Sequence, residues 1–174
     1  MSESGRLATG LRSDVCGALR ANDAERRVRL AGWIHRRRDH GSLVFIDLRD
    51  RYGIVQVVVD AATAPEAHAA LVDARIEWVI AVGGVVTPRR AGTENEKLPT
   101  GAIEVAADSV RILSQSKTPP FYINEPDAPI DESVRLKHRY LDLRREPLRD
   151  RLLMRSAMVQ AIREVHHEHG FVEV

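Results

Sequence analysis

The chain has 174 residues, enough for one domain of ordinary size and an additional segment. Its composition, 44% hydrophobic and 29% charged, is that of a globular protein, and its apolar runs are too short to span a bilayer. The single cysteine, Cys16, excludes an internal disulfide and a cysteine-based metal site. Residues 1–11 form a polar tail without the apolar core of a secretory signal, so we expect a cytoplasmic protein.

Positive charge is concentrated in one stretch, although the net charge of the chain is only +1. Residues 26–51 contain eight arginines and three aspartates, a local excess of +5. Such a patch on a neutral domain is typical of a phosphate-binding surface. A solvated charged face is the alternative, and the charge count by itself favours that alternative.

The first two thirds of the chain alternate apolar and polar residues with the period of β-strands. The predicted strands cover residues 26–38, 43–49, 54–59, 78–86 and 102–113. The first three are joined by four-residue turns and predict an antiparallel meander. An alanine-rich segment beginning at Pro65 predicts a short helix over residues 65–74. Five strands with a helix between the third and fourth indicate a mainly β protein with an OB-fold barrel, and a small sandwich is the alternative.

The last third of the chain differs in composition and in the spacing of its apolar residues. Residues 117–146 are proline-rich and then densely charged, which predicts a linker or hinge. From Pro147 onward the apolar spacing is helical, and Gly170 suits the position just after a helix. The predicted domains are therefore a tail and lead-in (1–25), an OB-fold domain (26–116), a linker or hinge (117–146) and one long helix (147–174).

Strand alternation also separates the two faces of the predicted sheet. The expected inward-facing residues are Val44, Ile46, Leu48, Val55, Val57, Val59, Ile103 and Val105. Phe45, Gln56 and Glu104 then lie on the outer face. An exposed aromatic ring can stack on a base, arginines can hold phosphates, and amide or carboxylate groups can bind base edges. Each residue alone fits ordinary strand patterning, but together on one face they favour binding of single-stranded nucleic acid.

Two long segments carry a family resemblance. Residues 32–41 read Gly-Trp-Ile-His-Arg-Arg-Arg-Asp-His-Gly, and residues 43–50 read Leu-Val-Phe-Ile-Asp-Leu-Arg-Asp. Together with residues 53–57 and 100–105, they resemble the anticodon-binding barrel of bacterial-type aspartyl-tRNA synthetases. Residues 135–145 are similar to the sequence that leads into the catalytic domain of this family. The relatives specific for lysine and asparagine share the barrel but differ in the first hairpin.

The resemblance implies roles for particular residues. Phe45 would stack on the middle uridine of the aspartate anticodon, and Arg38 and Gln56 would contact anticodon bases. Glu104 would recognise the first base, guanosine or its queuosine form. The implied RNA-binding set is Arg36, Arg38, Phe45, Gln56, Asn95 and Glu104. Arg89 is left out because the spacing around it departs from the pattern of the family.

Two further positions bear on the choice of tRNA. The resemblance associates His40, which follows Arg-Arg-Arg-Asp, with enzymes that charge asparagine tRNA as well as aspartate tRNA. A small residue in the loop before the fifth strand accompanies this relaxed form, and Gly92 matches it. We therefore expect a non-discriminating parent enzyme, while a simple turn function of His40 is the alternative.

No catalytic residue is predicted within the chain. In the class II synthetases that it resembles, the motifs binding ATP and aspartate follow later, so an inactive fragment is expected. The parent enzyme would use ATP and Mg²⁺ and form a homodimer, whereas the oligomeric state of the fragment stays open. His166 and His169 share a helix face, but surface histidines explain them better than a metal site does.

Two other classes of function remain as alternatives. One is a stand-alone barrel that binds single-stranded nucleic acid, and the other is a protein-interaction module built on the same scaffold. Neither needs a linker and residues 135–145 that resemble the approach to a catalytic domain. The leading prediction is therefore the tRNA-binding part of a ligase.

Overall fold

The computed structural model describes residues 9–125 and 127–174, and the chain divides into two compact units after Pro119. The described part of the first unit contains five strands, two short 3-10 helices and one α-helix. In chain order they are η1 (Cys16–Ala18), η2 (Ala21–Asp23), β1 (Arg27–His40), β2 (Leu43–Arg49), β3 (Ile54–Asp60), α2 (Pro65–Ala70), β4 (Val79–Pro88) and β5 (Ile103–Ser114).

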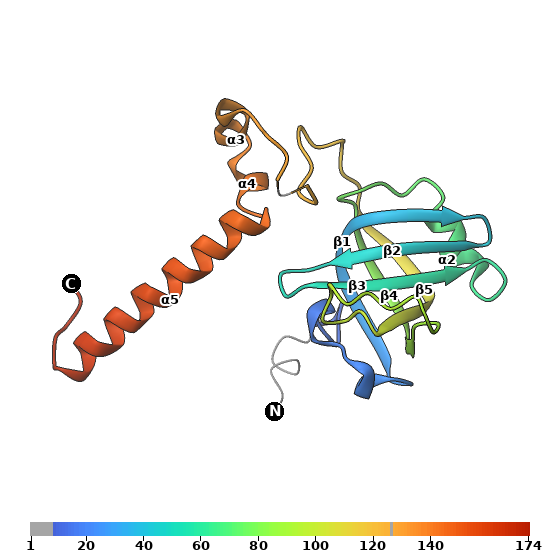
Figure 1. Cartoon of the computed structure of the whole chain (residues 1–174), viewed down its shortest axis with the longest axis horizontal. Coiled ribbons are helices and arrows are strands. Elements are labelled where there is room, and N and C mark those ends of the chain that lie inside the picture. The colour runs from blue at the N-terminus through green and yellow to red at the C-terminus, as the bar shows by residue number, and fades with distance from the viewer. Residues whose placement is uncertain (1–8, 126) are drawn as a thin grey trace. The chain divides into compact units, whose positions relative to one another are not determined.

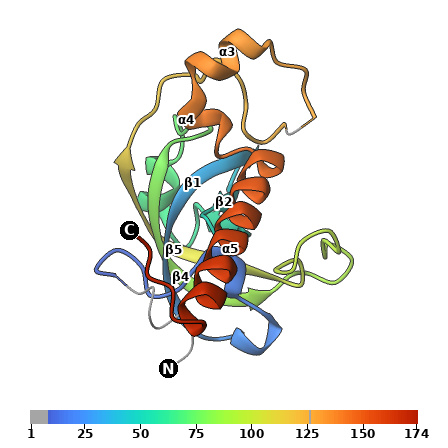
Figure 2. The same cartoon turned by 90° about the vertical axis from the view of Figure 1, so that its left-hand side faces the viewer.

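The five strands form a closed barrel in the order β1-β2-β3-β5-β4 (Figure 1). The β3–β5 pair is parallel and the other four pairs are antiparallel. Figure 2 shows β1 and β4 running side by side. Closure leaves no long unpaired strand edge. The predicted OB-fold barrel, with a helix between the third and fourth strands, is confirmed.

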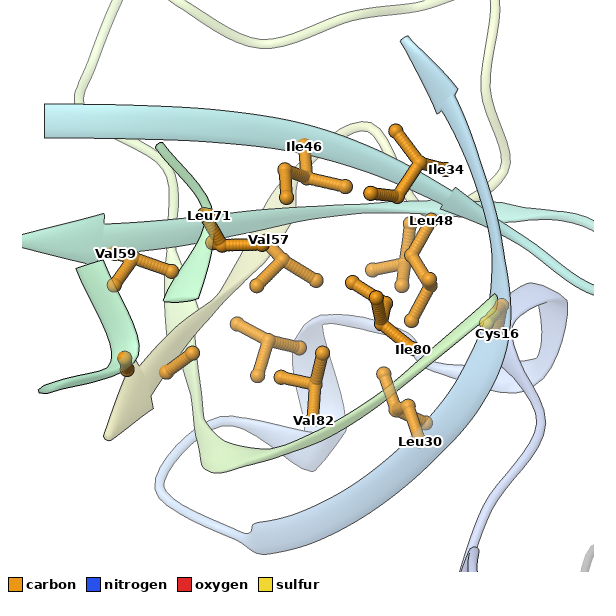
Figure 3. Close-up of a cluster of buried hydrophobic side chains, with 14 of the residues drawn as sticks. Cys16, Leu30, Ile34, Ile46, Leu48, Val57, Val59, Leu71, Ile80 and Val82 are labelled. Atoms are coloured by element: carbon orange, nitrogen blue, oxygen red, sulfur yellow. The ribbon is translucent and has the colours of Figure 1, made fainter. Parts of the chain in front are cut away.

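The residues that strand alternation assigned to the inside all belong to the barrel core, part of which Figure 3 shows. The eight predicted inward side chains are all at most 1% exposed. Leu71, which follows α2, reaches the same cluster and is fully buried. Because the core residues are mainly branched aliphatic side chains, they suit a pleated and half-buried surface.

Part of the N-terminal lead-in packs on this core. Cys16 and Leu19 are buried members of the barrel cluster, and the Cys16 backbone N–H donates to the Asp50 carboxylate at 2.8 Å. Burial, followed by the neighbouring charge of Asp50, raises the pKa of the Cys16 thiol. The predicted polar tail lies mostly outside the described residues, which begin at residue 9.

Several element boundaries differ from the prediction. The first hairpin is tighter, because His40 pairs with Leu43 and only two residues form the turn. Gly41 has φ +74°, which a glycine adopts without steric cost. Helix α2 ends at Ala70 rather than residue 74, and the chain then turns so that Leu71 and Ala74 are both buried. The fourth strand runs to Pro88 instead of residue 86.

The second unit contains α3 (Glu132–Lys137), α4 (Arg139–Asp142) and α5 (Glu146–Glu168). Residues 117–125 and 127–131 have no regular secondary structure, but the segment predicted as a linker also holds a small apolar cluster. Its members are Phe121, Ile123 and Leu141, with Ile130 and Val134 packed against them. This segment therefore has a core of its own.

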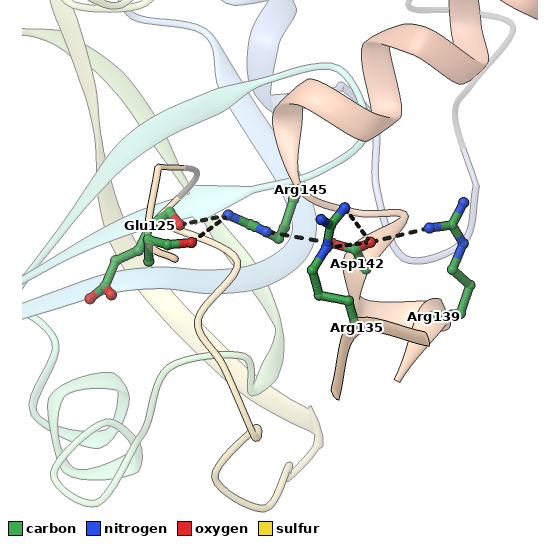
Figure 4. A network of polar contacts seen from close by, with 6 residues as sticks. Glu125, Arg135, Arg139, Asp142 and Arg145 are labelled. Atoms are coloured by element: carbon green, nitrogen blue, oxygen red, sulfur yellow. Dashed lines mark hydrogen bonds and ion pairs between the residues drawn. The ribbon is translucent and has the colours of Figure 1, made fainter. Parts of the chain in front are cut away.

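A buried carboxylate organises the charged part of this unit (Figure 4). Asp142 is 1% exposed and forms ion pairs with Arg135 at 3.1 Å, Arg139 at 3.2 Å and Arg145 at 3.5 Å. Arg145 also donates to the backbone carbonyls of Glu125 and Ala128, both at 3.3 Å. The arginine-rich sequence of residues 135–145 is thus explained by one shared carboxylate that joins the two short helices to the preceding loop.

Helix α5 agrees with the predicted long helix and begins with Pro147 in its first turn. Gly170, with φ +79°, follows its C-terminal cap, as the sequence predicted. Most apolar side chains of α5 are exposed, including Met154, Met158 and Ile162. Among the described residues, no helix is long and apolar enough to cross a membrane.

Candidate nucleic-acid interface

A β-bulge in β1 determines which side chains reach the outer face of the barrel. Ile34 pairs with Leu48 and Arg36 pairs with Asp47, so His35 is an additional residue between two consecutive pairs. The bulge reverses the alternation of β1. Ile34 points into the core, whereas Arg38, also even-numbered, pairs with the outward Phe45. Arg36 and Arg38 consequently lie on the outer face.

Four polar side chains on this face form one hydrogen-bonded row across four neighbouring strands, β1, β2, β3 and β5. Arg38 Nη2 donates to Asp47 Oδ1 at 3.2 Å and to Gln56 Oε1 at 3.1 Å. Gln56 Nε2 donates to Glu104 Oε2 at 2.7 Å. We name Asp47, Arg38, Gln56 and Glu104 the polar row. Three of the predicted RNA-binding residues belong to it.

The Phe45 ring lies at one end of this face and is half-buried. The His40 ring approaches it edge-on, with centroids 5.5 Å apart and an interplanar angle of 88°. The Arg38 guanidinium carbon lies over the ring at 5.9 Å from its centroid, near the outer limit for a cation–π contact. The structure therefore joins the predicted stacking residue, Phe45, to both Arg38 and the predicted discrimination residue His40.

Gln56 differs from the simple expectation of an exposed polar side chain. It points away from the core, as predicted, yet it is only 6% exposed. Its amide oxygen accepts from Arg38 and its amide nitrogen donates to Glu104. A base that binds Gln56 must therefore use the second amide hydrogen or the second lone pair of the amide oxygen, or displace one of these partners.

Three other predicted residues are not joined to the polar row. Arg36 is exposed, and Asn95 holds its own loop, accepting from the Lys97 backbone N–H at 3.1 Å. Gly92 lies in the same loop with φ +84°, and open space surrounds the position of a Cβ atom. The left-handed backbone, rather than crowding, therefore favours glycine at this position.

Carboxylates neutralise much of the arginine-rich stretch, so its charge in the folded chain is lower than the local excess of +5 suggests. Five of its eight arginines form ion pairs: Arg26 with Asp14 and Asp23, Arg27 with Asp108, Arg37 with Asp39, Arg38 with Asp47, and Arg49 with Glu77. Several of these acids lie outside residues 26–51, so a local count omits them. Arg36 has no ion pair within the described residues and remains a candidate for contacting phosphate.

Sequence reasoning gave no function to two groups that the structure places beside this face. Asp47 stands between the inward-facing Ile46 and Leu48, so alternation places it outward, but its contact with Arg38 could be found only from the register of β1 against β2. The second group is His35, Arg49 and Glu77, which lie at the bulge.

The histidines of α5 contact their own helix. His166 Nδ1 and His169 Nδ1 lie 2.8 Å from the carbonyls of Ile162 and Val165, respectively. Across the part of the chain that the structure describes, no group of three histidine, cysteine or acidic side chains could hold a metal ion.

Two family descriptions match the chain: "OB-fold nucleic acid binding domain" over residues 28–113 and "tRNA synthetases class II (D, K and N)" over residues 131–174. Among named relatives, the Aspartate--tRNA(Asp/Asn) ligase of Rubrobacter xylanophilus is 50% identical over 98% of this chain and 28% of the relative. The ligase of the same name from Protochlamydia amoebophila is 47% identical over 94% of this chain and 27% of its own length.

A solved structure is also similar. The asparaginyl-tRNA synthetase of Pyrococcus horikoshii matches with a TM-score of 0.77 and 25% identity, over 92% of this chain and 35% of that chain. Fold, outer face and comparisons together define an OB-fold nucleic-acid-binding domain followed by residues of the class II tRNA synthetase type. The chain belongs to the aspartyl-tRNA synthetase family. It spans just over a quarter of the length of the two named ligases.

Proposed function

We propose that the chain binds the anticodon of aspartate tRNA through the outer face of β1, β2, β3 and β5. The observation that carries the proposal is the polar row with the Phe45 ring beside it. The face offers a stacking surface, a guanidinium, an amide and a carboxylate within one connected set. These are the groups that proteins use to bind unstacked bases by stacking and by hydrogen bonds to their edges.

Within this proposal, Phe45 stacks on the middle uridine and Arg38 and Gln56 contact anticodon bases. Glu104 accepts hydrogen bonds from the N–H groups of the first base, guanosine or queuosine. Arg36 and Asn95 complete the RNA-binding set; the exposed Arg36 supplies positive charge for a phosphate.

The proposed parent protein is a cytoplasmic, homodimeric aspartate–tRNA ligase that uses ATP and Mg²⁺. Neither ATP nor Mg²⁺ is assigned to any residue of this chain. Residues 26–116 are the proposed anticodon-binding domain, with residues 1–25 as a tail and lead-in. Residues 117–146 form the proposed hinge, and residues 147–174 contain the first helix of the catalytic domain.

A titration with RNA hairpins tests the binding proposal. The chain should bind the aspartate anticodon stem-loop more tightly than a hairpin of equal length with a scrambled loop, and added salt should weaken binding. Equal affinity for both hairpins would instead favour a stand-alone barrel for single-stranded nucleic acid. No RNA binding at all would favour the protein-interaction alternative.

We further propose that the asparagine anticodon is tolerated, supported by His40 and Gly92 and by the names of the two ligases. The two anticodons differ only at the third base. The ring nitrogens of His40 can donate or accept, so they can adapt to cytosine or uracil. Leucine has no such group.

His40→Leu should therefore lower the affinity for the asparagine stem-loop by about tenfold relative to the aspartate stem-loop. The measurement is the ratio of the two dissociation constants, compared between the variant and the original chain. A ratio unchanged by His40→Leu would return His40 to a simple turn function.

A further inference from the structure

The bulge in β1 is held by a closed ring of hydrogen bonds. The Glu77 backbone N–H donates to the Ile34 carbonyl at 2.8 Å, directly before the additional residue His35. Arg49 Nη2 donates to Glu77 Oε1, and Arg49 Nη1 donates to His35 Nδ1, both at 2.7 Å. Ile34 and His35 are joined covalently, which closes the ring. The ring thus ties β1, the end of β2 and the turn before β4 together at the bulge.

Because Arg49 and Glu77 are buried, each charge depends strongly on the other. Arg49 is 8% exposed and Glu77 is 5% exposed. A buried ion pair gains little net stability, but it strongly disfavours conformations in which either charge loses its partner. The pair is therefore better suited to selecting one backbone conformation than to adding stability.

The backbone conformation of Glu77 indicates that its carboxylate is needed for the contact with Arg49. Its φ of +68° lies in the left-handed region, where glycine is the residue without steric cost. Glutamate at such a position keeps the backbone N–H on Ile34 while its carboxylate reaches Arg49.

His35 contributes a neutral acceptor to the ring. Burial and then the positive charge of Arg49 lower the pKa of His35 to about 4, although Asp47 and Glu77 act in the opposite direction. At neutral pH the imidazole of His35 is therefore uncharged. Because the guanidinium of Arg49 can only donate, Nδ1 must be the unprotonated nitrogen that accepts from it. The proton of the imidazole is then on Nε2.

We propose that His35, Arg49 and Glu77 form a positioning cluster for RNA binding, which fixes the β-bulge and so keeps Arg36 and Arg38 on the face that carries Phe45 and Gln56. Without the additional residue, the alternation of Ile34 would continue and would direct both arginines toward the core. The inference rests on the proposed function, because the face matters only if it binds the anticodon. The three residues act through Arg38 and need not touch the RNA.

Two substitutions of His35 distinguish the effect of its hydrogen-bond acceptor from the effect of its side-chain size. His35→Asn keeps an acceptor near the place of Nδ1, whereas His35→Leu removes it. The whole chain is titrated with the aspartate anticodon stem-loop. His35→Leu should weaken binding about tenfold, and His35→Asn should stay within about twofold of the original chain.

A double-mutant cycle with Arg38→Ala tests whether the effect passes through Arg38. Arg38→Ala alone should weaken binding about tenfold, and adding His35→Leu should cost no more than about twofold beyond that. Losses that add in full, or a His35→Leu chain that binds normally, would overturn the positioning cluster. Tryptophan fluorescence checks that each variant is folded. If His35→Leu does not fold, His35→Ala replaces it with the same expectations.

The same measurements distinguish this inference from the proposed function. If Arg38→Ala weakens binding but neither His35→Leu nor His35→Ala does, the anticodon-binding face stands and only the positioning cluster fails. If Arg38→Ala leaves the affinity unchanged, both the assigned role of Arg38 and the positioning cluster are wrong. Asp108→Asn provides the control, because Asp108 of β5 forms an exposed ion pair with Arg27 of β1, away from the bulge.

Discussion

Phe45→Ala should weaken binding of the aspartate anticodon stem-loop by about 1–3 kcal/mol, the loss expected when a stacking ring is removed. The ring is half-buried and lies beside the polar row, so a stacked base would be held next to Arg38 and Gln56. The dissociation constant, measured for the whole chain at fixed salt, should rise roughly five- to 150-fold.

Two further variants determine whether a ring is what matters. Phe45→Trp retains an aromatic face and should preserve most of the affinity. Tyr52→Ala removes another exposed aromatic residue, whose ring lies near the Arg51 guanidinium at 5.9 Å, and should leave binding unchanged. If Phe45→Ala and Tyr52→Ala bind equally well, Phe45 is a packing residue and the stacking role is wrong.

The hydrogen bonds within the polar row also affect how a base could bind to it. Gln56 already uses its amide oxygen and nitrogen in contacts with Arg38 and Glu104. In the proposed complex, a base edge that displaces one of these contacts gains only the difference between the new hydrogen bond and the old one. Such a site discriminates well, because a wrong base leaves buried polar groups without partners.

The barrel and its core were predictable because they depend on local alternation. Val44, Ile46 and Leu48 follow the period of a strand, and every second side chain is buried as that period requires. The long helix from Glu146 was predictable for a similar reason, since its apolar spacing and terminal residues are local signals.

The candidate site was only partly predictable, because its contacts join residues distant in the sequence. Gln56 meets Arg38 across 18 positions and Glu104 across 48 positions, so no local pattern could reveal the row or the burial of Gln56. The bulge at His35 is equally hidden. Simple alternation from Ile34 would bury Arg38, and only the register against β2 reverses this expectation.

Glu77→Ala should be strongly destabilising, because it leaves the buried guanidinium of Arg49 without its carboxylate. Removing one partner of a buried ion pair costs about 3–5 kcal/mol, a large share of the total stability of a typical domain. Glutamate and alanine both carry a Cβ, so the left-handed backbone at this position costs both residues about equally, and the expected loss comes from the ion pair. The free energy of unfolding is measured by urea denaturation at neutral pH, with tryptophan fluorescence as the probe of unfolding.

Fluorescence isolates the relevant unit, because both tryptophans of the chain, Trp33 and Trp78, lie before Pro119. The matched control is Asp108→Asn. The side chains of the Arg27–Asp108 pair are 65% and 45% exposed, so its loss should cost at most about 1 kcal/mol. A similar small cost for both variants would mean that Arg49 finds another partner or water, and the closed ring would then not constrain the bulge. A large loss of stability for Glu77→Ala alone would show that the barrel depends on the contacts that hold the β-bulge, where β1 changes its alternation.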